Sequence, residues 1–417
     1  MLYVLLQLLH FVAKNEHIYS CPAAMKPRAT YFSHLDGLRT VACLGVFLFH
    51  SLFIYAYLWT PHDAPVFRYG LRLLSLGAQG VSLFFVLSGF LITYLLLQEE
   101  AARGRVSIGA FYWRRALRIW PLYFVCMGFG FVLVPWYMHL TQQPWHETAD
   151  PGMFALFLAN FDGFRHGNAI PAAFNLAVLW SVSVEEQFYL VWPVLLMVLF
   201  RWWRPGACLL IIGLSLWFRY THPTDEARLY AHTLSVAGDL AVGSLAGWAS
   251  FRYAGLRAWL GRWPRWAVPA VYLGLLVLLA AQYVLGPHPL NVAVERLLRA
   301  AFFAFIVLEQ NYAAHSPFKL GRSRWLTYWG TYTYGFYCLH PIVLMVVSET
   351  IRQFGLPTQL PTVVGLTLVS LPLSAGLAWL SYEYLERPFL KLKTRRLAAP
   401  GVGSPRTKEA RKAVVNG

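Results

Sequence analysis

Long apolar stretches recur along the whole chain, and they restrict its fold more than any other feature. A helix crosses a bilayer with about 20 consecutive apolar residues, and in lipid its backbone groups must be satisfied internally. Ten such stretches can be proposed, with centres near residues 48, 86, 127, 191, 212, 241, 275, 304, 335 and 372. The sequence therefore predicts an all-α, polytopic integral membrane protein with about ten transmembrane helices.

The composition favours the same class. Hydrophobic residues make up 58% of the 417 residues and charged residues only 13%, so we expect the lipid bilayer as a partner and no separate soluble domain. The net charge of +16 is interpreted as loop charge rather than as a nucleic-acid surface. Neither a disulfide framework nor a metal site is predicted, because four of the five cysteines stand singly in apolar segments: Cys43, Cys126, Cys208 and Cys338.

Basic residues are dense in every second predicted loop. Cytoplasmic loops carry the excess of Arg and Lys, so both termini are predicted to be cytoplasmic. The stretch Gly152 to Asn160 is a candidate for a segment that dips into the membrane, which makes the count of spans good to about one. The predicted orientation gathers the basic clusters on one side: Arg103/Arg105/Arg114/Arg115/Arg118, Arg201/Arg204, Arg252/Arg257/Arg262/Arg265, Lys319/Arg322/Arg324 and the tail from Arg387.

Three segments are expected along the chain. Residues 1–30 form an N-terminal lead, residues 31–392 the transmembrane domain, and residues 393–417 a basic, disordered cytoplasmic tail. The apolar run from Leu2 to Ala13 is too short to span a bilayer. Met25 is an equally good start of the protein, because a basic cytoplasmic lead and the first full span follow it.

Arg39 and His50 lie on the first predicted span. At 100° per residue, both side chains point to the same side of a helix, roughly 16 Å apart along its axis. Polar groups at membrane depth are costly, and they normally mark a substrate path or a relay. This face is therefore the first candidate for function.

Two consecutive carboxylates, Glu185 and Glu186, stand at the predicted outer entrance of the fourth span. Ser183 and Glu186 match an S-x-x-E capping box, which is a purely structural interpretation. That interpretation accounts for one glutamate only, and it does not explain Tyr189 at the mouth of a span kinked by Pro193. A catalytic role for both carboxylates is the alternative.

Arg114, Arg115 and Arg118 cluster where the third span begins. Anchoring at the cytoplasmic face is one interpretation of this cluster. Recognition of phosphate groups is the other, because forked guanidinium donors suit phosphates better than lysine does. The near-absence of lysine in this segment favours recognition.

His340 lies deep in the ninth span, with Tyr332, Tyr334 and Tyr337 expected around it. A lone histidine in a membrane helix often bonds a neighbouring helix and nothing more. A second imidazole at His50 favours a path lined by polar groups.

Two further sets of residues are expected to be structural. Gly80, Ser88 and Gly89 are predicted to let helices approach closely. Glu383 and Glu386 close the last span and are expected to pair with the basic loops at the inner surface.

Six motifs follow one another in register: L-D-G-L-R-x10-H, F-F-V-L-S-G-F-L-I, R-R-A-L-R-I-W-P-L-Y, L-W-S-V-S-V-E-E-Q-F-Y-L-V-W-P, Y-G-F-Y-C-L-H-P-I and E-R-P-F. Together they resemble the membrane-bound acyltransferase-3 family of sugar O-acyltransferases. The resemblance runs from about Tyr31 to Leu392, nearly the whole chain. Each motif alone is moderately specific, whereas six in the same order form a strong signal.

The resemblance implies a multi-pass enzyme of the inner (plasma) membrane that takes an acyl group, usually acetyl, from cytoplasmic acyl-CoA. The acceptor would be a hydroxyl group of an extracytoplasmic glycan, such as a polysaccharide or lipopolysaccharide, or of a lipid-linked sugar. His50 would serve as general base or acyl carrier, and His340 with the two glutamates would receive the acceptor. The implied site residues are Arg39 and His50 for the Arg-x10-His pair, Arg114, Arg115 and Arg118 for binding CoA, and Ser183, Glu185 and Glu186 for the Ser-Glu-Glu region.

Two other classes fit the polar residues. A secondary transporter or exporter also uses intramembrane His, Arg and Glu, although the sequence contains no repeat of the kind that many transporters have. A non-catalytic protein that binds or assembles glycans is the third class. The enzyme is the interpretation that the six motifs favour.

Overall fold

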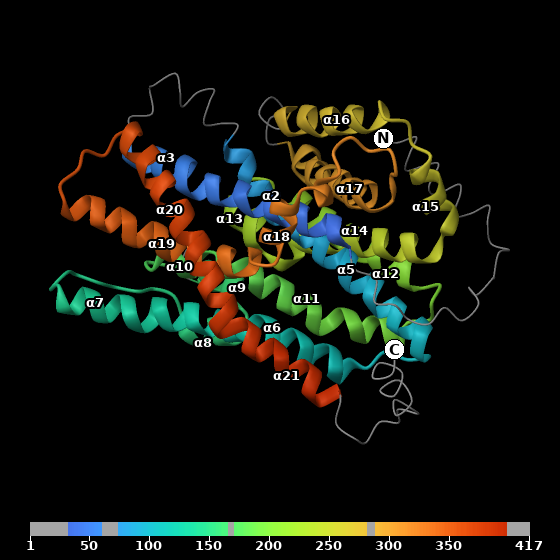
Figure 1. Cartoon of the computed structure of the whole chain (residues 1–417), viewed down its shortest axis with the longest axis horizontal. Helices are drawn as coiled ribbons and strands as arrows, with labels where there is room; N and C mark the ends of the chain where they lie inside the picture. Colours follow the sequence, from blue (N-terminus) through green and yellow to red (C-terminus); the bar gives the residue numbers. More distant parts are fainter. Residues whose placement is uncertain (1–31, 61–73, 166–170, 282–287, 398–417) are drawn as a thin grey trace, which may run out of the picture.

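The computed structural model describes residues 32–60, 74–165, 171–281 and 288–397, and in these ranges the chain is helical without any strand. The lead expected at residues 1–30 lies outside the described residues. Figure 1 shows the helices running mostly along the long axis of the molecule, side by side in one bundle.

The first half of the chain forms three long helical rods followed by short connecting helices. The rods are interrupted by π or 3-10 turns, which are labelled η. Their bounds are α2 (Ser33–Leu48), η1 (Phe49–Ile54), α3 (Tyr55–Trp59), η2 (Leu76–Gln79), α5 (Gly80–Arg103), α6 (Ile108–Gly128), η3 (Phe129–Leu133), α7 (Val134–Leu140), α8 (Pro151–Ala155), α9 (Ala159–Arg165) and α10 (Phe174–Ala177).

The second half alternates long and short helices in the same way. Its elements are α11 (Leu179–Val198), α12 (Arg204–Thr221), α13 (Glu226–Ala231), α14 (Thr233–Arg252), α15 (Ala254–Gly261), α16 (Ala267–Ala281), α17 (Pro289–Tyr312), η4 (Leu320–Arg322), α18 (Arg324–Gly330), α19 (Thr333–Gln353), α20 (Leu360–Ser381), η5 (Tyr382–Glu386) and α21 (Arg387–Leu397).

Six helical segments of the described chain are long and apolar enough to cross a membrane, which confirms the multi-pass membrane class. They are Ser33–Trp59, Leu76–Arg103, Ile108–Leu140, Glu226–Arg252, Thr333–Gln353 and Leu360–Leu392. Each of the ten centres expected from the sequence also falls within a helix, namely α2, α5, α6, α11, α12, α14, α16, α17, α19 and α20. The count of ten crossings stays a prediction.

Helices α5 and α14 pack with their backbones almost in contact. A Cβ atom added to Gly89 would lie 2.0 Å from the carbonyl oxygen of Leu240, and one added to Gly243 would lie 2.1 Å from that of Val86. A side chain at either glycine would force the two helices apart. The predicted close packing is therefore confirmed at Gly89, and also at Gly80, where the added Cβ would lie 2.5 Å from a backbone oxygen of α2.

Helix α2 lies within the bundle and contacts α5, α17, α18 and α19 (Figure 1). Most of its apolar side chains are buried, including Leu35, Val46 and Phe47, whereas Val41 is exposed. The helix that carries Arg39 and His50 is therefore held on several sides, which fixes the positions of both side chains.

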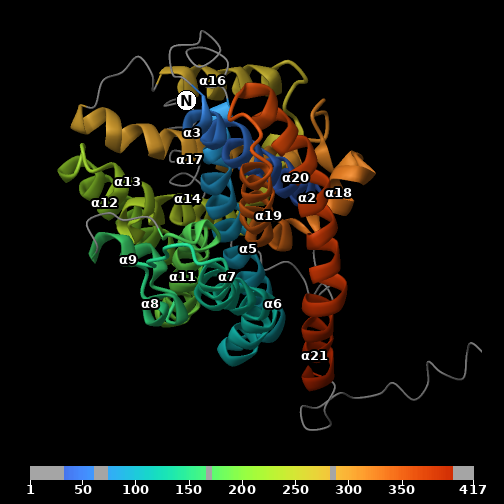
Figure 2. The same cartoon turned by 90° about the vertical axis from the view of Figure 1, so that its left-hand side faces the viewer.

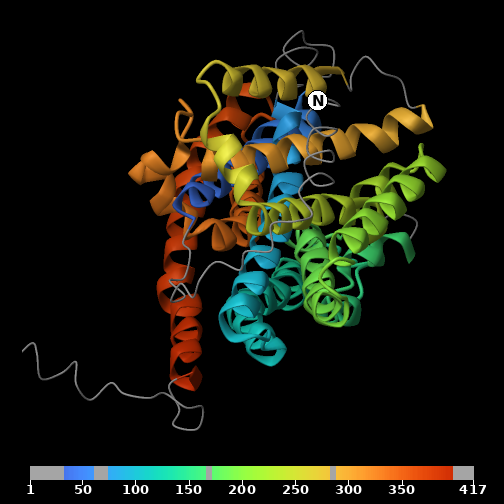
Figure 3. The same cartoon turned by 90° about the vertical axis from the view of Figure 1, so that its right-hand side faces the viewer.

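Two segments outside the predicted spans contain helices. The candidate for a segment that dips into the membrane forms the two short helices α8 and α9, separated by Phe157, whose φ is 56°. At the other end of the chain, α21 runs to Leu397 and so enters the segment expected to be a tail, while residues 398–417 lie outside the described ones. Figures 2 and 3 show α21 projecting beyond the other helices.

Candidate active site

His50 and His340 form a pair inside the bundle. Nδ1 of His50 lies 2.9 Å from Nε2 of His340, and the two rings stack with their centroids 5.1 Å apart. His340 is 1% exposed, and the rings of Phe47, Phe174 and Phe336 pack around the pair. The structure thus joins two imidazoles that the sequence placed on separate spans.

The hydrogen bonds assign the protons of this pair. Nδ1 of His340 lies 3.1 Å from the carbonyl oxygen of Phe336, and a carbonyl only accepts, so this nitrogen carries a proton. In a neutral ring Nε2 of His340 is then an acceptor, and it receives the Nδ1 proton of His50. Nε2 of His50 therefore keeps its lone pair. Such a nitrogen can take a proton from a hydroxyl group or attack a carbonyl carbon.

Local helix geometry sets His50 apart from the rest of its rod. His50 lies in η1, a π-helical turn that follows α2 directly. Single π turns inside α-helices are rare and frequently occur at functional sites. The wider turn re-aims the side chains that follow Leu48, which a simple 100° periodicity does not predict.

Arg39, Arg115 and Arg118 approach one another from α2 and α6. Arg118 interacts electrostatically with both of the other arginines. Arg39 forms a 2.6 Å ion pair with Asp36 on its own helix, and the guanidinium of Arg115 lies 5.1 Å from the centroid of the Tyr189 ring. Among the described residues, neither Arg115 nor Arg118 makes a hydrogen bond or an ion pair. Their donors are available for an anion.

Arg114 does not join this arginine group. Its guanidinium makes a 3.2 Å ion pair with Glu99 of α5, and the same carboxylate accepts a 3.3 Å hydrogen bond from the backbone of Ser107. The pair fastens the turn between α5 and α6. The three arginines therefore differ in their surroundings, since Arg114 already has a carboxylate partner, and a phosphate-binding role for Arg114 stays a prediction.

Glu185 also lies with the arginine group rather than with His340. Its carboxylate accepts a 2.8 Å hydrogen bond from Ser88 and a 2.6 Å hydrogen bond from Tyr189, and Arg115 interacts with it electrostatically. The predicted position at the outer entrance is therefore wrong, since Glu185 lies within α11. Sequence analysis assigned Ser88 to packing alone and missed this contact, although a serine in an otherwise apolar motif was the available signal.

Glu186 faces α6 from the next position of α11. One carboxylate oxygen accepts a 3.1 Å hydrogen bond from the indole of Trp120, and the other is buried without a hydrogen-bond partner among the described residues. The predicted capping box is wrong, because α11 begins at Leu179. Ser183 lies inside the helix, and its hydroxyl donates to the carbonyl oxygen of Leu179 at 3.1 Å.

Tyr337 is the tyrosine that lies against the histidine pair. Its ring centroid is 6.0 Å from that of His340, and its hydroxyl oxygen lies 2.7 Å from the hydroxyl oxygen of Ser181. Tyr332 and Tyr334 point elsewhere, with their hydroxyl groups donating to residues of α18 and α6. The prediction of three tyrosines around His340 is correct for Tyr337 only.

Glu386 lies near the arginine group in η5, another π-helical turn. It is 4% exposed, accepts a 3.3 Å hydrogen bond from Ser381 and interacts electrostatically with Arg118. Glu383 pairs with Arg387 one turn further along the same helix. Glu383 therefore pairs with a basic residue of its own helix and not of a loop, whereas Glu386 forms no ion pair with the described residues.

Comparison with known families agrees with the motifs. The chain matches the family described as an acyltransferase domain over residues 32–379, which is most of its length. The chain belongs to this acyltransferase family. The matched range includes both histidines and the whole arginine group.

Curated relatives carry acetyltransferase names. This acyltransferase is 30% identical over 225 residues to the peptidoglycan O-acetyltransferase of Listeria monocytogenes, covering 51% of the chain and 33% of that protein. It is 26% identical over 385 residues to a putative peptidoglycan O-acetyltransferase of Bacillus subtilis, covering 86% of the chain and 55% of that protein. A putative O-acetyltransferase of Staphylococcus aureus is 24% identical over 395 residues, with shares of 87% and 58%.

The chain spans between 33% and 58% of the length of these three relatives. No solved structure matches it. The site has two parts, which lie along the rod formed by α2 and η1. The arginine group lies at Arg39 and the histidine pair at His50, roughly 16 Å apart along the helix.

Proposed function

We propose that this acyltransferase moves an acyl group, acetyl in the first instance, from cytoplasmic acyl-CoA to a hydroxyl group of an extracytoplasmic glycan. The observation that carries the proposal is the lone pair left on Nε2 of His50 by the hydrogen-bonded chain from Phe336 through His340. The names of the relatives make peptidoglycan fragments the first acceptors to try.

Donor binding is assigned to the arginine group. The phosphates of CoA are multiply charged, and guanidinium groups bind phosphate through paired donors. Arg115 and Arg118 have such donors available, and Arg39 adds a third positive charge beside them. The roughly 16 Å between Arg39 and His50 matches the reach of an extended pantetheine arm, so a thioester held there would lie beside the imidazole.

His50 is proposed to act as the general base. Its Nε2 takes the proton from the acceptor hydroxyl while the oxygen attacks the thioester carbonyl carbon. The tetrahedral intermediate then collapses, the carbon–sulfur bond breaks, and the proton passes from the imidazolium to the departing thiolate. The products are the acyl ester and free CoA. A covalent acyl-histidine relay is the alternative route, and release of CoA before any acceptor is added would reveal it.

His340 is proposed to position His50. We expect His340→Ala to lower kcat about ten- to hundredfold, because His50 loses the acceptor that holds its tautomer and ring orientation. The KM for acyl-CoA should change little, since the arginine group is remote. Steady-state rates on the purified protein measure both constants. His340→Gln should recover part of kcat, because its amide oxygen can accept the same proton, and equal loss in both variants would contradict this role.

The proposed topology places the protein in the inner (plasma) membrane with ten crossings and both termini in the cytoplasm. A reporter fused after Arg396 should then be cytoplasmic, and one inserted near Gly167 extracytoplasmic, because the basic loops all fall on the side of the termini. Paired alkaline phosphatase and fluorescent-protein fusions measure this directly. Finding both sites on one side would refute the arrangement.

Label transfer from radioactive acetyl-CoA tests the function itself. Purified protein in lipid nanodiscs should move label to a glycan fragment, and the ester should be released by mild base. A transporter would carry label across a vesicle membrane without forming an ester, and a binding protein would do neither. Peptidoglycan fragments, lipopolysaccharide and exopolysaccharide are compared side by side as acceptors.

A further inference from the structure

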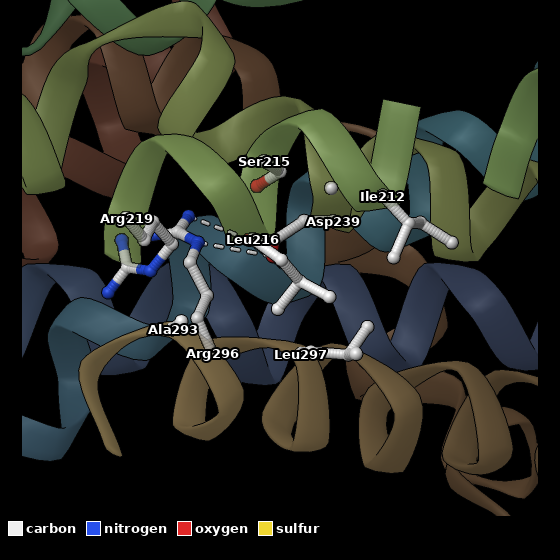
Figure 4. A pocket seen from close by; sticks show the side chains of 9 residues that line it. Ile212, Ser215, Leu216, Arg219, Asp239, Ala293, Arg296 and Leu297 are labelled. Carbon is white, nitrogen blue, oxygen red and sulfur yellow. Dashed lines mark hydrogen bonds and ion pairs between the residues drawn. The ribbon is translucent and has the colours of Figure 1, made fainter. Parts of the chain in front are cut away.

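A cleft that the proposed mechanism does not use opens between η2, the start of α5, α11, α13 and α17. It encloses about 260 Å³, and its lining includes Trp180, Tyr230, Arg219, Glu295 and Arg296. This volume is close to the lower end of the range of about 300 to 1,000 Å³ that is typical of ligand pockets with a few converging polar groups. A smaller pocket, drawn in Figure 4, shares Arg219 and Arg296 with this lining.

Arg219 is a buried cation without an ion-pair partner. It is 6% exposed, and its Nε and Nη1 atoms donate to the backbone oxygens of Val292 and Leu229 and to the hydroxyl of Ser235, at 2.7 to 3.1 Å. Its Nη2 makes no hydrogen bond with the described residues. A buried charge without a counter-ion is costly, which favours an anionic ligand at this position.

The neighbouring carboxylates are already engaged. Asp239 accepts two hydrogen bonds from Arg296, at 2.7 and 3.2 Å, which Figure 4 draws as dashed lines. Glu295 forms a 3.2 Å ion pair with Arg299 one turn along α17. These pairs neutralise each other, which leaves two charges in the lining unpaired among the described residues: buried Arg219 and the exposed carboxylate of Glu226 in the first turn of α13.

Aromatic side chains form another wall of the cleft. The rings of Trp180 and Tyr230 lie 4.8 Å apart, and Phe85 packs against Trp180 from behind. Tyr230 is 44% exposed. A rigid aromatic wall beside fixed polar groups suits a sugar ring, which has apolar C–H faces and an edge of hydroxyl groups.

Two side chains, Ser181 and Tyr337, connect the wall of the cleft to the histidine pair. Ser181 follows Trp180 directly and shares a 2.7 Å hydrogen bond with Tyr337, whose ring is 6.0 Å from His340. We propose that this cleft is the acceptor site and that it binds a carboxylate-bearing pyranose, with the ring against Trp180 and Tyr230 and the carboxylate on Arg219. This proposal rests on the proposed function, because it requires the bound sugar to present its hydroxyl group to His50.

Binding of two small sugars tests the cleft without acyl transfer. Calorimetric titration of the full chain in nanodiscs compares methyl glucuronoside with neutral methyl glucoside. We expect the acidic sugar to bind at least tenfold more tightly, because only it has a carboxylate for Arg219. Arg219→Gln should abolish this preference. Equal affinity of the two sugars for the wild-type chain, or binding of neither, overturns the proposal.

Arg219 also makes three hydrogen bonds within the protein, so Arg219→Gln risks disturbing the fold and a second variant is needed. Tyr230→Ala changes an exposed ring and should weaken both sugars about tenfold, whereas unchanged binding overturns the aromatic wall. Tyr220→Ala is the matched control, because it removes an exposed ring beside Arg219 that does not line the cleft. Label transfer in the same preparation separates the two proposals: loss of sugar binding with intact transfer refutes the cleft and leaves the proposed function standing.

Discussion

Replacing His50 by alanine should reduce acyl transfer by about a hundred- to ten-thousandfold, the range expected for the loss of a positioned general base. The reason lies in the geometry of the pair. His340 is held by the carbonyl of Phe336, so its Nε2 accepts from His50 and leaves the second nitrogen of His50 unprotonated. In the variant Nε2 of His340 loses its partner, but it lies next to the former position of His50 Nδ1 and not where the missing Nε2 would reach the substrate.

The measurement is the initial rate of label transfer from acetyl-CoA at saturating acceptor. His139→Ala provides the matched control, since His139 is an exposed residue of α7 outside the pair. Yield, membrane insertion and the thermal unfolding midpoint show whether each variant is folded. A folded His50→Ala protein with the wild-type rate would remove His50 from the mechanism and transfer the chemistry to another group.

Sequence periodicity was enough to predict the helices but not the relations between them. Each expected centre lies in a helix because an apolar stretch of about 20 residues has few alternatives in lipid. The pairing of His50 with His340 depends on how α19 packs beside α2, which local sequence does not encode. The π turn at His50 adds a local rotation that a constant 100° step leaves out.

The sequence also does not show which charged residues pair with one another. Arg114, Arg115 and Arg118 look equivalent in sequence. In the structure Arg114 forms an ion pair with Glu99 of α5, whereas Arg115 and Arg118 form none with the described residues. Glu185 looks like an entrance residue because it follows a polar loop, whereas Ser88 and Tyr189 hold it inside the bundle. Whether a charged side chain is structural or available to a ligand therefore depends on partners that lie on other helices.

Donor binding should depend on Arg118 much more than on Arg114. Arg118→Lys keeps the positive charge and therefore the topology, but it loses the planar fork that grips a phosphate. Losing one charge-assisted hydrogen bond costs about 1.5 to 3 kcal/mol, which is roughly a ten- to hundredfold rise in the apparent Kd for acyl-CoA. The same substitution at Arg114 disturbs an ion pair with Glu99 that lysine can also make.

Two saturation curves on each variant decide between binding and anchoring, one with acyl-CoA varied and one with acceptor varied. For Arg118→Lys the acyl-CoA curve should shift and the acceptor curve should stay, because the arginine group is proposed to bind the donor and not the acceptor. For Arg114→Lys neither curve should move by more than a few-fold, since lysine can keep the ion pair with Glu99. An unmoved acyl-CoA curve for Arg118→Lys, or equal shifts of its acyl-CoA and acceptor curves, would mean that the cluster only anchors the helix in the membrane. In that case the donor phosphates would have to bind at another basic loop of the same face.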